Sequence, residues 1–367
     1  MKLLLVKAFV AALRMLYAPL KLRKTQNKIL WLSRQSDKPS PDMRLLSDEL
    51  AVIMPNIRQQ FRLRKLRDES SLTLGYIFSV IGDAFAISSA KLVITDTYSI
   101  PVSCLTHKKG TEIIQLWHAA GAVKKFSLQA VGKEQGRDES ISKALCMHRN
   151  YTCVIAPSQN TAKFYCEAFG CDESIVKICG LPRLDVLLDG KNRRAEFTEK
   201  NPRFAGKTIA VYVPTFRSGD GEYADMLRKA FAAQNACELA VSVHPLSTTS
   251  HSDDLCGAFS SAELIKLADY VITDYSACAF EAALLGKKLM FYLPDYEKYK
   301  AEQGLNADPF AELPFASFTD AETLCKAVCG GEYDFTALNE FCDKYIASRA
   351  ADNTVRLAEI VKEVYER

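Results

Sequence analysis

The stretch YVITDYSACAFEAALLGKKLMFYLP (270–294) decides the fold class. It contains a continuous apolar strand, a turn, an alanine-rich helix that begins near Ser276, and a second apolar strand. Strands that are apolar on both faces and are joined through a helix form parallel sheets covered by helices on both sides. The stretch therefore predicts an α/β protein.

The same alternation of apolar runs and helical stretches extends over most of the chain. Further runs occupy residues 28–33, 91–96, 112–118, 153–158, 208–215 and 239–245. A chain of 367 residues is too long for one ordinary α/β domain. We therefore expect two doubly wound, Rossmann-like domains at 28–188 and 208–345, a polar linker at 189–207, and a C-terminal helix at 346–367 that packs across the domains.

Charge is distributed unevenly along the chain. Residues 1–67 contain 15 Lys and Arg against 4 Asp and Glu, whereas the rest contains 32 against 40. In the apolar segment 1–27, Lys7, Arg14 and Lys21 recur every seven residues and fall within about 40° of one another on a helix. This pattern is typical of an amphipathic basic helix lying on an anionic membrane surface, to which the basic residues at 58–67 would add attraction. A core helix with solvated charges is the alternative; nucleic acid is disfavoured, because no stacking-aromatic motif accompanies the basic residues.

Several common sequence motifs are absent, which argues against some classes of enzyme. The chain has no phosphate-binding loop of the G-x-x-x-x-G-K-[ST] type, no G-x-G-x-x-G, no D-x-D and no G-x-S-x-G. Its 12 Cys include no C-x-x-C pair, and most of them read as small buried apolar residues. We expect no bound metal, no cofactor and a reducing compartment.

Candidate functional residues stand at the ends of the predicted strands, where parallel sheets bind ligands. His118 follows the run 112–118 and suits a general base, and Lys124 comes shortly after it. In the later sheet, Asp274 and Ser276 lie at a strand end and helix start that suit a pyrophosphate, and Glu281 suits ribose hydroxyls. The remaining candidates for phosphate contacts are Arg183, Arg217 and His244. Taken singly, each of these residues also fits a purely structural role.

Taken in order, the motifs WHAAGAVKK, APS, GLPRLD, VPTFR, VHP and LADYVITDYSACAFEAALLGKKLMFYLPDYEKY resemble the CDP-glycerol glycerophosphotransferase family of teichoic acid synthesis. The resemblance covers residues 112–300, and TDYS is its most specific part. It implies a glycosyltransferase-B architecture, membrane association through a basic surface, and no metal requirement.

The resemblance also implies roles for individual residues. His118 matches the base that activates the acceptor, and His244, Ser276 and Glu281 match donor contacts, with Arg183 and Arg217 nearby. The chain departs from the family pattern at four positions close to these motifs: Ala119, Ala120, Phe216 and Ala277. His148 matches no motif of the family.

The resemblance implies a peripheral enzyme on the cytoplasmic face of the cell membrane. It would transfer glycerol phosphate from CDP-glycerol to a hydroxyl of a lipid-linked acceptor and release CMP, in the synthesis of a teichoic-acid-like wall polymer. A CDP-ribitol-dependent transferase and a nucleotide-sugar glycosyltransferase of the same fold are the alternatives. A catalytically silent membrane scaffold is a third.

Overall fold

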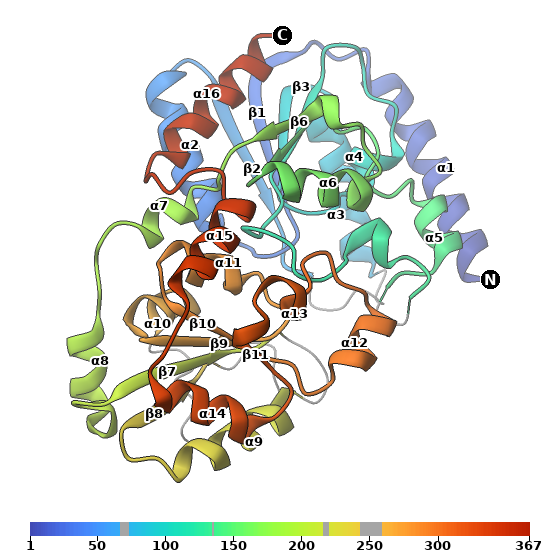
Figure 1. Cartoon of the computed structure of the whole chain (residues 1–367). Coiled ribbons are helices and arrows are strands. Elements are labelled where there is room, and N and C mark those ends of the chain that lie inside the picture. Colours follow the sequence, from blue (N-terminus) through green and yellow to red (C-terminus); the bar gives the residue numbers. More distant parts are fainter. Residues whose placement is uncertain (67–72, 134–135, 216–219, 243–258) are drawn as a thin grey trace. The chain divides into compact units, whose positions relative to one another are not determined.

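The structure, a computed structural model, describes residues 1–66, 73–133, 136–215, 220–242 and 259–367. The chain forms two compact units. The first contains Met1–Ala119, Phe126–Asp185 and Ala350–Arg367, and the second contains Ala120–Lys125 and Val186–Arg349. Each unit is built on one parallel sheet with helices packed against it (Figure 1). The predicted α/β class with two parallel sheets is confirmed.

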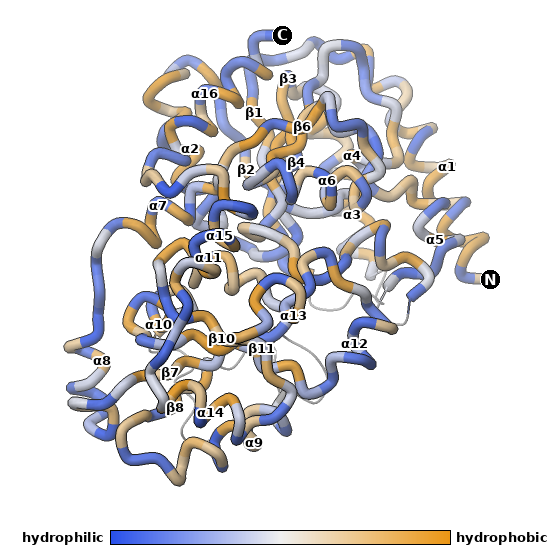
Figure 2. Tube along the Cα trace, viewed as in Figure 1, coloured by the Kyte–Doolittle hydropathy of each residue, from blue (hydrophilic) through white to orange (hydrophobic). Residues whose placement is uncertain are grey.

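The sheet of the first unit has the strand order β2-β1-β3-β4-β5-β6, and every pair is parallel. Its strands are β1 (Gln26–Ser33), β2 (Arg58–Leu63), β3 (Ala90–Thr95), β4 (Glu112–Gln115), β5 (Cys153–Ala156) and β6 (Val176–Ile178). All the residues of β5 and most of those of β1 and β3 are buried, as expected for strands covered on both faces. Figure 2 shows hydrophobic stretches along the strands of both sheets.

Edge strand β2 carries much of the basic cluster at 58–67, which the sequence did not predict to be a strand. None of its side chains is fully buried, as expected for a strand at the edge of the sheet. Phe61 lies directly opposite Trp31 of β1, and the two rings stack with centroids 5.5 Å apart. The Trp31 Nε1–H also donates to Gln59 Oε1 at 2.8 Å. Contacts to a buried tryptophan thus fix a strand of mostly polar sequence.

In the described part of the first unit, eight α-helices surround this sheet or border it. They are α1 (Lys2–Leu20), α2 (Pro41–Ile53), α3 (Leu74–Ile87), α4 (Ile100–Cys104), α5 (Glu139–Ala144), α6 (Gln159–Phe169), α7 (Arg183–Leu187, at the boundary of the units) and α16 (Asn353–Glu366), with the 3-10 turns η1 (Ser127–Ala130) and η2 (Glu173–Ile175). Local signals set several of their ends. Ser158 accepts from Thr161 N at 3.1 Å and caps α6, which ends at Gly170 in the left-handed conformation.

The C-terminal helix α16 packs beside α2 in the first unit, although the two are far apart in sequence (Figure 1). Leu357, Val361 and Val364 join the buried cluster that also holds Trp31. The helix start is capped by Asp185, whose carboxylate accepts from the backbone and side chains of residues 353 and 354 at 2.6–3.0 Å. The expected position of this helix was across both domains; its contacts place it in the first unit.

Helix α1 is apolar on two opposite faces. Val6, Val10, Leu13 and Tyr17 are buried against the body of the first unit. Among the described residues, α1 is the one helix long and apolar enough to cross a membrane, although core helices and signal sequences share that length and composition. An N-terminal apolar helix is therefore present, and only one of its faces is needed for packing.

The sheet of the second unit has the order β11-β10-β9-β7-β8, again all parallel. Its strands are β7 (Thr208–Val213), β8 (Cys237–Val241), β9 (Tyr270–Thr273), β10 (Lys288–Tyr292) and β11 (Ser317–Phe318). Its helices are α8 (Arg194–Lys200), α9 (Asp220–Ala232), α10 (Ser261–Leu267), α11 (Cys278–Leu284), α12 (Tyr296–Glu302), α13 (Pro309–Glu312), α14 (Ala321–Gly330) and α15 (Phe335–Tyr345), with η3 (Pro202–Phe204) and η4 (Pro314–Ala316). The strand–helix–strand unit read from 270–294 is β9, α11 and β10.

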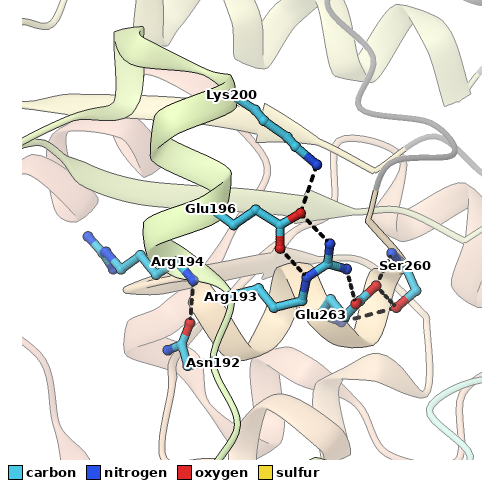
Figure 3. Close-up of polar contacts among 7 residues, drawn as sticks. All are labelled: Asn192, Arg193, Arg194, Glu196, Lys200, Ser260 and Glu263. Atoms are coloured by element: carbon cyan, nitrogen blue, oxygen red, sulfur yellow. Dashed lines mark hydrogen bonds and ion pairs between the residues drawn. The ribbon is translucent and has the colours of Figure 1, made fainter.

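The polar stretch expected to be a linker, 189–207, contains α8 and η3 and is tied to α10 by charges (Figure 3). Arg193 donates to Glu196 and to Glu263, and Lys200 donates to Glu196 at 2.7 Å. The donors Arg193 and Lys200 lower the pKa of Glu196 to about 2. Since exposed ion pairs add little stability, we assign these contacts to orientation: they hold α8 against the start of α10.

Candidate functional site

His118 stands just beyond β4 in the first unit, half-buried. Its Nδ1 lies 2.8 Å from the backbone carbonyl oxygen of Asp96, at the end of the neighbouring strand β3. Because a carbonyl only accepts, the ring donates from Nδ1, and in the neutral ring the lone pair is then on Nε2. The Gln35 side-chain amide nitrogen lies 3.3 Å from Nε2 and 3.5 Å from Nδ1 of the same ring. A neutral imidazole with an accepting Nε2 is the form that a general base requires.

The backbone that aims His118 is strained. Trp117 has a φ of 57°, a left-handed conformation that is rare for a bulky residue. The Trp117 N–H donates to Gln115 Oε1 at 2.9 Å, and Gln115 is fully buried, with its amide donating to Tyr151 Oη at 2.9 Å. The buried Gln115 side chain therefore stabilises the turn that directs His118 toward Asp96.

The carboxyl group of Asp96 is a second unusual feature of this turn. Its residue is 2% exposed, and among the described residues neither carboxylate oxygen meets a hydrogen-bond donor in good geometry. Burial is the main cause that raises the pKa of Asp96 to about 6. A carboxyl with a perturbed pKa next to a candidate base is typical of a functional site rather than of a site selected for stability.

Asp96→Asn should raise the free energy of unfolding at about pH 7.5 by roughly 1–3 kcal/mol. The native pKa lies above the unfolded value, so the native state binds more protons, and the cost of the buried carboxylate grows as the pH rises through this window. Denaturant unfolding at about pH 4 and pH 7.5 measures the difference between variant and wild type, which should nearly vanish at the lower pH. Asp48→Asn, at an exposed position of α2, is the control and should leave the free energy of unfolding unchanged at both pH values. An equal difference in unfolding free energy between Asp96→Asn and wild type at both pH values would contradict the burial of a charged Asp96.

In the second unit, the ends of β7 and β9 are joined by a buried carboxylate. Asp274 is fully buried, and its Oδ1 accepts from both Thr215 N at 2.8 Å and Thr215 Oγ1 at 2.6 Å. Asp274 thereby fixes the point from which the chain leaves β7. The geometry supports a positioning role for Asp274, and its predicted contact with substrate stays a prediction.

Ser276 and Glu281 lie at the start of α11, where the sequence predicted them. Ser276 Oγ accepts from Cys278 N at 3.3 Å, and Glu281 is half-buried in the first turn. Alanines on the inner face of the helix are fully buried, which brings α11 close to the sheet. Ser276 and Glu281 are therefore brought together on one helix end, and their predicted contacts with a donor stay predictions.

The loop 120–125, directly after His118 in the chain, packs in the second unit against this helix. A Cβ on Gly121 would lie 2.4 Å from the ring of Phe280, so only glycine fits there. The loop pairs with residues 304–306: Lys124 forms a bridge with Leu305, and Lys125 N donates to Gly304 O at 2.9 Å. Lys124 is thus held in the second unit, together with the α11 residues.

Three predicted phosphate-binding residues lie elsewhere or outside the described part of the chain. Arg183 donates to Asp42 through its backbone N–H at 2.8 Å and through Nε at 2.6 Å, so its guanidinium is engaged in an ion pair at the start of α2. Arg217 and His244 lie outside the described residues.

His148 is buried among aromatic rings, where burial lowers its pKa to about 3, and its Nδ1 lies 2.8 Å from Tyr151 Oη. We therefore treat His148 as a structural residue.

Gln35 and Asp96 are the residues at His118 that sequence reasoning missed. Both lie at the ends of predicted apolar strands, and this position is the sequence feature that could have identified them. Gln35 lies in the polar stretch after β1, and Asp96 ends the run 91–96. Their contact with His118 depends on β1, β3 and β4 being neighbours in the sheet, and the strand order was not predictable.

Two all-parallel sheets, with polar side chains at the strand ends of each, define an α/β protein of the architecture found in the wall teichoic acid polymerase TagF. A solved structure of TagF matches with a TM-score of 0.70 at 18% identity, over 96% of this chain and 94% of that one. At this identity the match supports the fold alone.

Sequence comparison defines the family. The profile described as CDP-Glycerol:Poly(glycerophosphate) glycerophosphotransferase matches residues 15–363, so the chain belongs to this family of teichoic acid phosphotransferases. The teichoic acid ribitol-phosphate primase of Bacillus spizizenii is 26% identical over 91% of this chain and 90% of its own length. The teichoic acid glycerol-phosphate primase of Bacillus subtilis is 26% identical over 76% of each chain.

Proposed function

We propose that this protein transfers glycerol phosphate from CDP-glycerol to a hydroxyl of a lipid-linked acceptor and releases CMP. The observation that carries the proposal is the orientation of His118, whose Nδ1 donates to the Asp96 carbonyl, so that in the neutral ring Nε2 can accept a proton. In a family of teichoic acid phosphotransferases, the proton to be removed is that of the attacking hydroxyl.

In the proposed step, the acceptor oxygen attacks the β-phosphorus of the CDP-alcohol. The bond from that phosphorus to the bridging oxygen breaks, CMP leaves with the bond electrons, and the hydroxyl proton moves to His118 Nε2. Phosphoryl transfer of this kind depends mainly on positioning and charge stabilisation. We assign donor binding to Ser276 and Glu281 at α11, with Lys124 on the adjoining loop and with Arg217 and His244.

CDP-ribitol is the second candidate donor. Relatives named for glycerol phosphate and for ribitol phosphate are both 26% identical to this chain, so they favour neither alcohol. We propose primase-like transfer, because the match to the ribitol-phosphate primase covers 90% of that relative. A nucleotide-sugar transferase of the glycosyltransferase-B fold is the remaining alternative.

Release of nucleotide from a panel of donors tests the proposal. CDP-glycerol, CDP-ribitol and UDP-N-acetylglucosamine are each incubated with the protein and a membrane-extract acceptor, and CMP, UMP and UDP are quantified. We expect CMP from one CDP-alcohol in preference to the other. UDP release from the nucleotide sugar, with no CMP from either CDP-alcohol, would replace the proposal with the glycosyltransferase alternative.

We further propose peripheral attachment to the cytoplasmic face of the cell membrane through α1. The face of α1 opposite its buried side exposes Leu4, Leu5, Met15 and Leu16, each more than half exposed. Arg14 of the predicted basic stripe turns to the protein and donates to Cys104 O at 2.8 Å. Apolar insertion is therefore the main attraction, with the remaining cations of the N-terminal region adding charge attraction to anionic lipids.

Replacing Leu5 and Leu16 together by Gln should reduce sedimentation with phosphatidylglycerol-containing vesicles by tenfold or more, since burying a leucine contributes about 1.5–3 kcal/mol. Both side chains face away from the protein, so the thermal unfolding midpoint should stay the same. The matched control is the double variant Val52→Gln and Val355→Gln, at exposed apolar positions of α2 and α16. Equal sedimentation of the two double variants would contradict attachment through α1.

A further inference from the structure

The first unit contains a pocket of about 330 Å³ at the carboxyl ends of β1, β2 and β3. Three arginines and three hydroxyl-bearing residues line it. The arginines are Arg34 in the turn after β1, Arg62 of β2 and Arg64 just after β2; the hydroxyls belong to Ser79 of α3 and to Thr97 and Ser99 after β3. Parallel sheets bind ligands at this edge, and the volume lies at the lower end of the range of ligand pockets. The pocket is therefore large enough for a small polar ligand.

The charges around this pocket favour an anion. The three arginines face one described carboxylate, Asp83, which pairs with Arg62 through Nε at 2.5 Å. Arg34 Nη1 donates to Tyr98 O at 3.0 Å, but its Nε is buried and has no hydrogen-bond partner among the described residues. A buried N–H without an acceptor is costly, so an incoming oxyanion would stabilise this arginine.

Helix α3 is shaped to make room for the arginines. A Cβ on Gly82 would lie 2.5 Å from Arg62 Nη2, and a Cβ on Gly75 would lie 3.2 Å from Arg64 Nη2. With Ser79 between them, these positions lie on one face of α3, and each glycine inside a helix costs about 0.5–1 kcal/mol relative to alanine. The helix thus gives up stability where the guanidinium groups need space.

The pocket and His118 share the same two turns of chain. The turn after β1 places Arg34 in the pocket and the next residue, Gln35, 3.3 Å from His118 Nε2. The turn after β3 supplies the Asp96 carbonyl to His118, and the next residue, Thr97, accepts from Arg34 N at 3.3 Å. The same two turns of chain therefore contribute to both the pocket and the surroundings of the candidate base.

We propose that this pocket binds a phosphodiester group of the acceptor, so that the hydroxyl beyond that phosphate reaches His118 Nε2. Guanidinium groups match phosphate oxygens in geometry and charge, and the pocket hydroxyls supply further hydrogen bonds. The proposal rests on the proposed function, because it assigns the acceptor, and not the donor, to the first unit.

A binding experiment tests the site without relying on activity. Glycerophosphoglycerol, a small phosphodiester, is titrated into the full-length protein and followed by isothermal calorimetry, with diglycerol as the neutral comparison. The variants are Arg34→Gln and Arg64→Gln; the control is Arg58→Gln, an exposed arginine at the start of β2 that does not line the pocket. We expect binding of glycerophosphoglycerol alone, weakened at least tenfold in both variants and unchanged in the control.

A kinetic arm separates this proposal from the proposed function. With wild-type CMP release established, KM for a soluble phosphodiester acceptor should rise at least tenfold in both variants, and KM for the CDP-alcohol should stay within twofold. A rise in the donor KM instead would overturn the assignment to the acceptor, as would equal glycerophosphoglycerol binding in wild type and both variants. Loss of vesicle binding with an unchanged acceptor KM would assign the arginines to lipid head groups and also overturn it. If no CDP-alcohol yields CMP, the proposed function fails while the calorimetric result still decides the site.

Discussion

His118→Ala should lower kcat by about 10²- to 10⁴-fold, the usual loss when a general base is removed. The affinity for the CDP-alcohol should be unchanged, because donor binding is assigned to residues of the second unit. Steady-state kinetics of CMP release gives kcat, and calorimetry with the intact donor gives Kd. Gln35→Ala is the companion variant: its amide lies at hydrogen-bond distance from the ring nitrogens but takes no proton, so we expect less than a tenfold change in kcat.

A near-normal rate for His118→Ala would show that another group takes the proton. A loss of donor affinity equal to the loss of rate would instead place His118 at the nucleotide. The unfolding midpoint of the variant is measured alongside, because the half-buried ring also packs against Trp117 with centroids 4.1 Å apart.

Glu281→Ala should weaken binding of CDP and of CMP alike, by about ten- to a hundredfold, the range for a lost hydrogen bond to a charged group. The two nucleotides share the ribose that is the proposed partner of this carboxylate. Calorimetry with each nucleotide measures the loss without any acceptor. Glu297→Ala, an exposed glutamate in the first turn of α12, is the control and should bind both nucleotides normally. Loss of CDP binding with unchanged CMP binding would move Glu281 from the ribose to the β-phosphate.

Much of the fold was predictable because buried parallel strands are continuously apolar. The runs at 28–33, 91–96 and 270–276 correspond to β1, β3 and β9, with ends displaced by up to three residues. Because the apolar runs were recognisable, the positions of His118 and Ser276 just after strands were predictable too. Strand β2 was not predictable, because RQQFRL is stabilised by Trp31 and by its place at the edge of the sheet and not by its own hydrophobicity.

The site was predictable only where a residue type and a strand end sufficed. The Asp96 carbonyl that orients His118 is a backbone group, and the strain at Trp117 depends on the buried Gln115 side chain; neither leaves a pattern in the sequence. Arg183 matched a family motif, yet its guanidinium pairs with Asp42, 141 residues away in sequence. Tertiary neighbours of this kind are set by strand order, which local sequence does not specify.

The central claim is that one phosphoryl group moves from a CDP-alcohol to the acceptor while CMP leaves. The most direct measurement uses CDP-glycerol labelled at the β-phosphorus, with wild type and His118→Ala in parallel. We predict that the label enters the acceptor in equal amount to the CMP released, and that the variant loses both together. Label that stays with the nucleotide, or CMP release that His118→Ala leaves intact, would contradict the account.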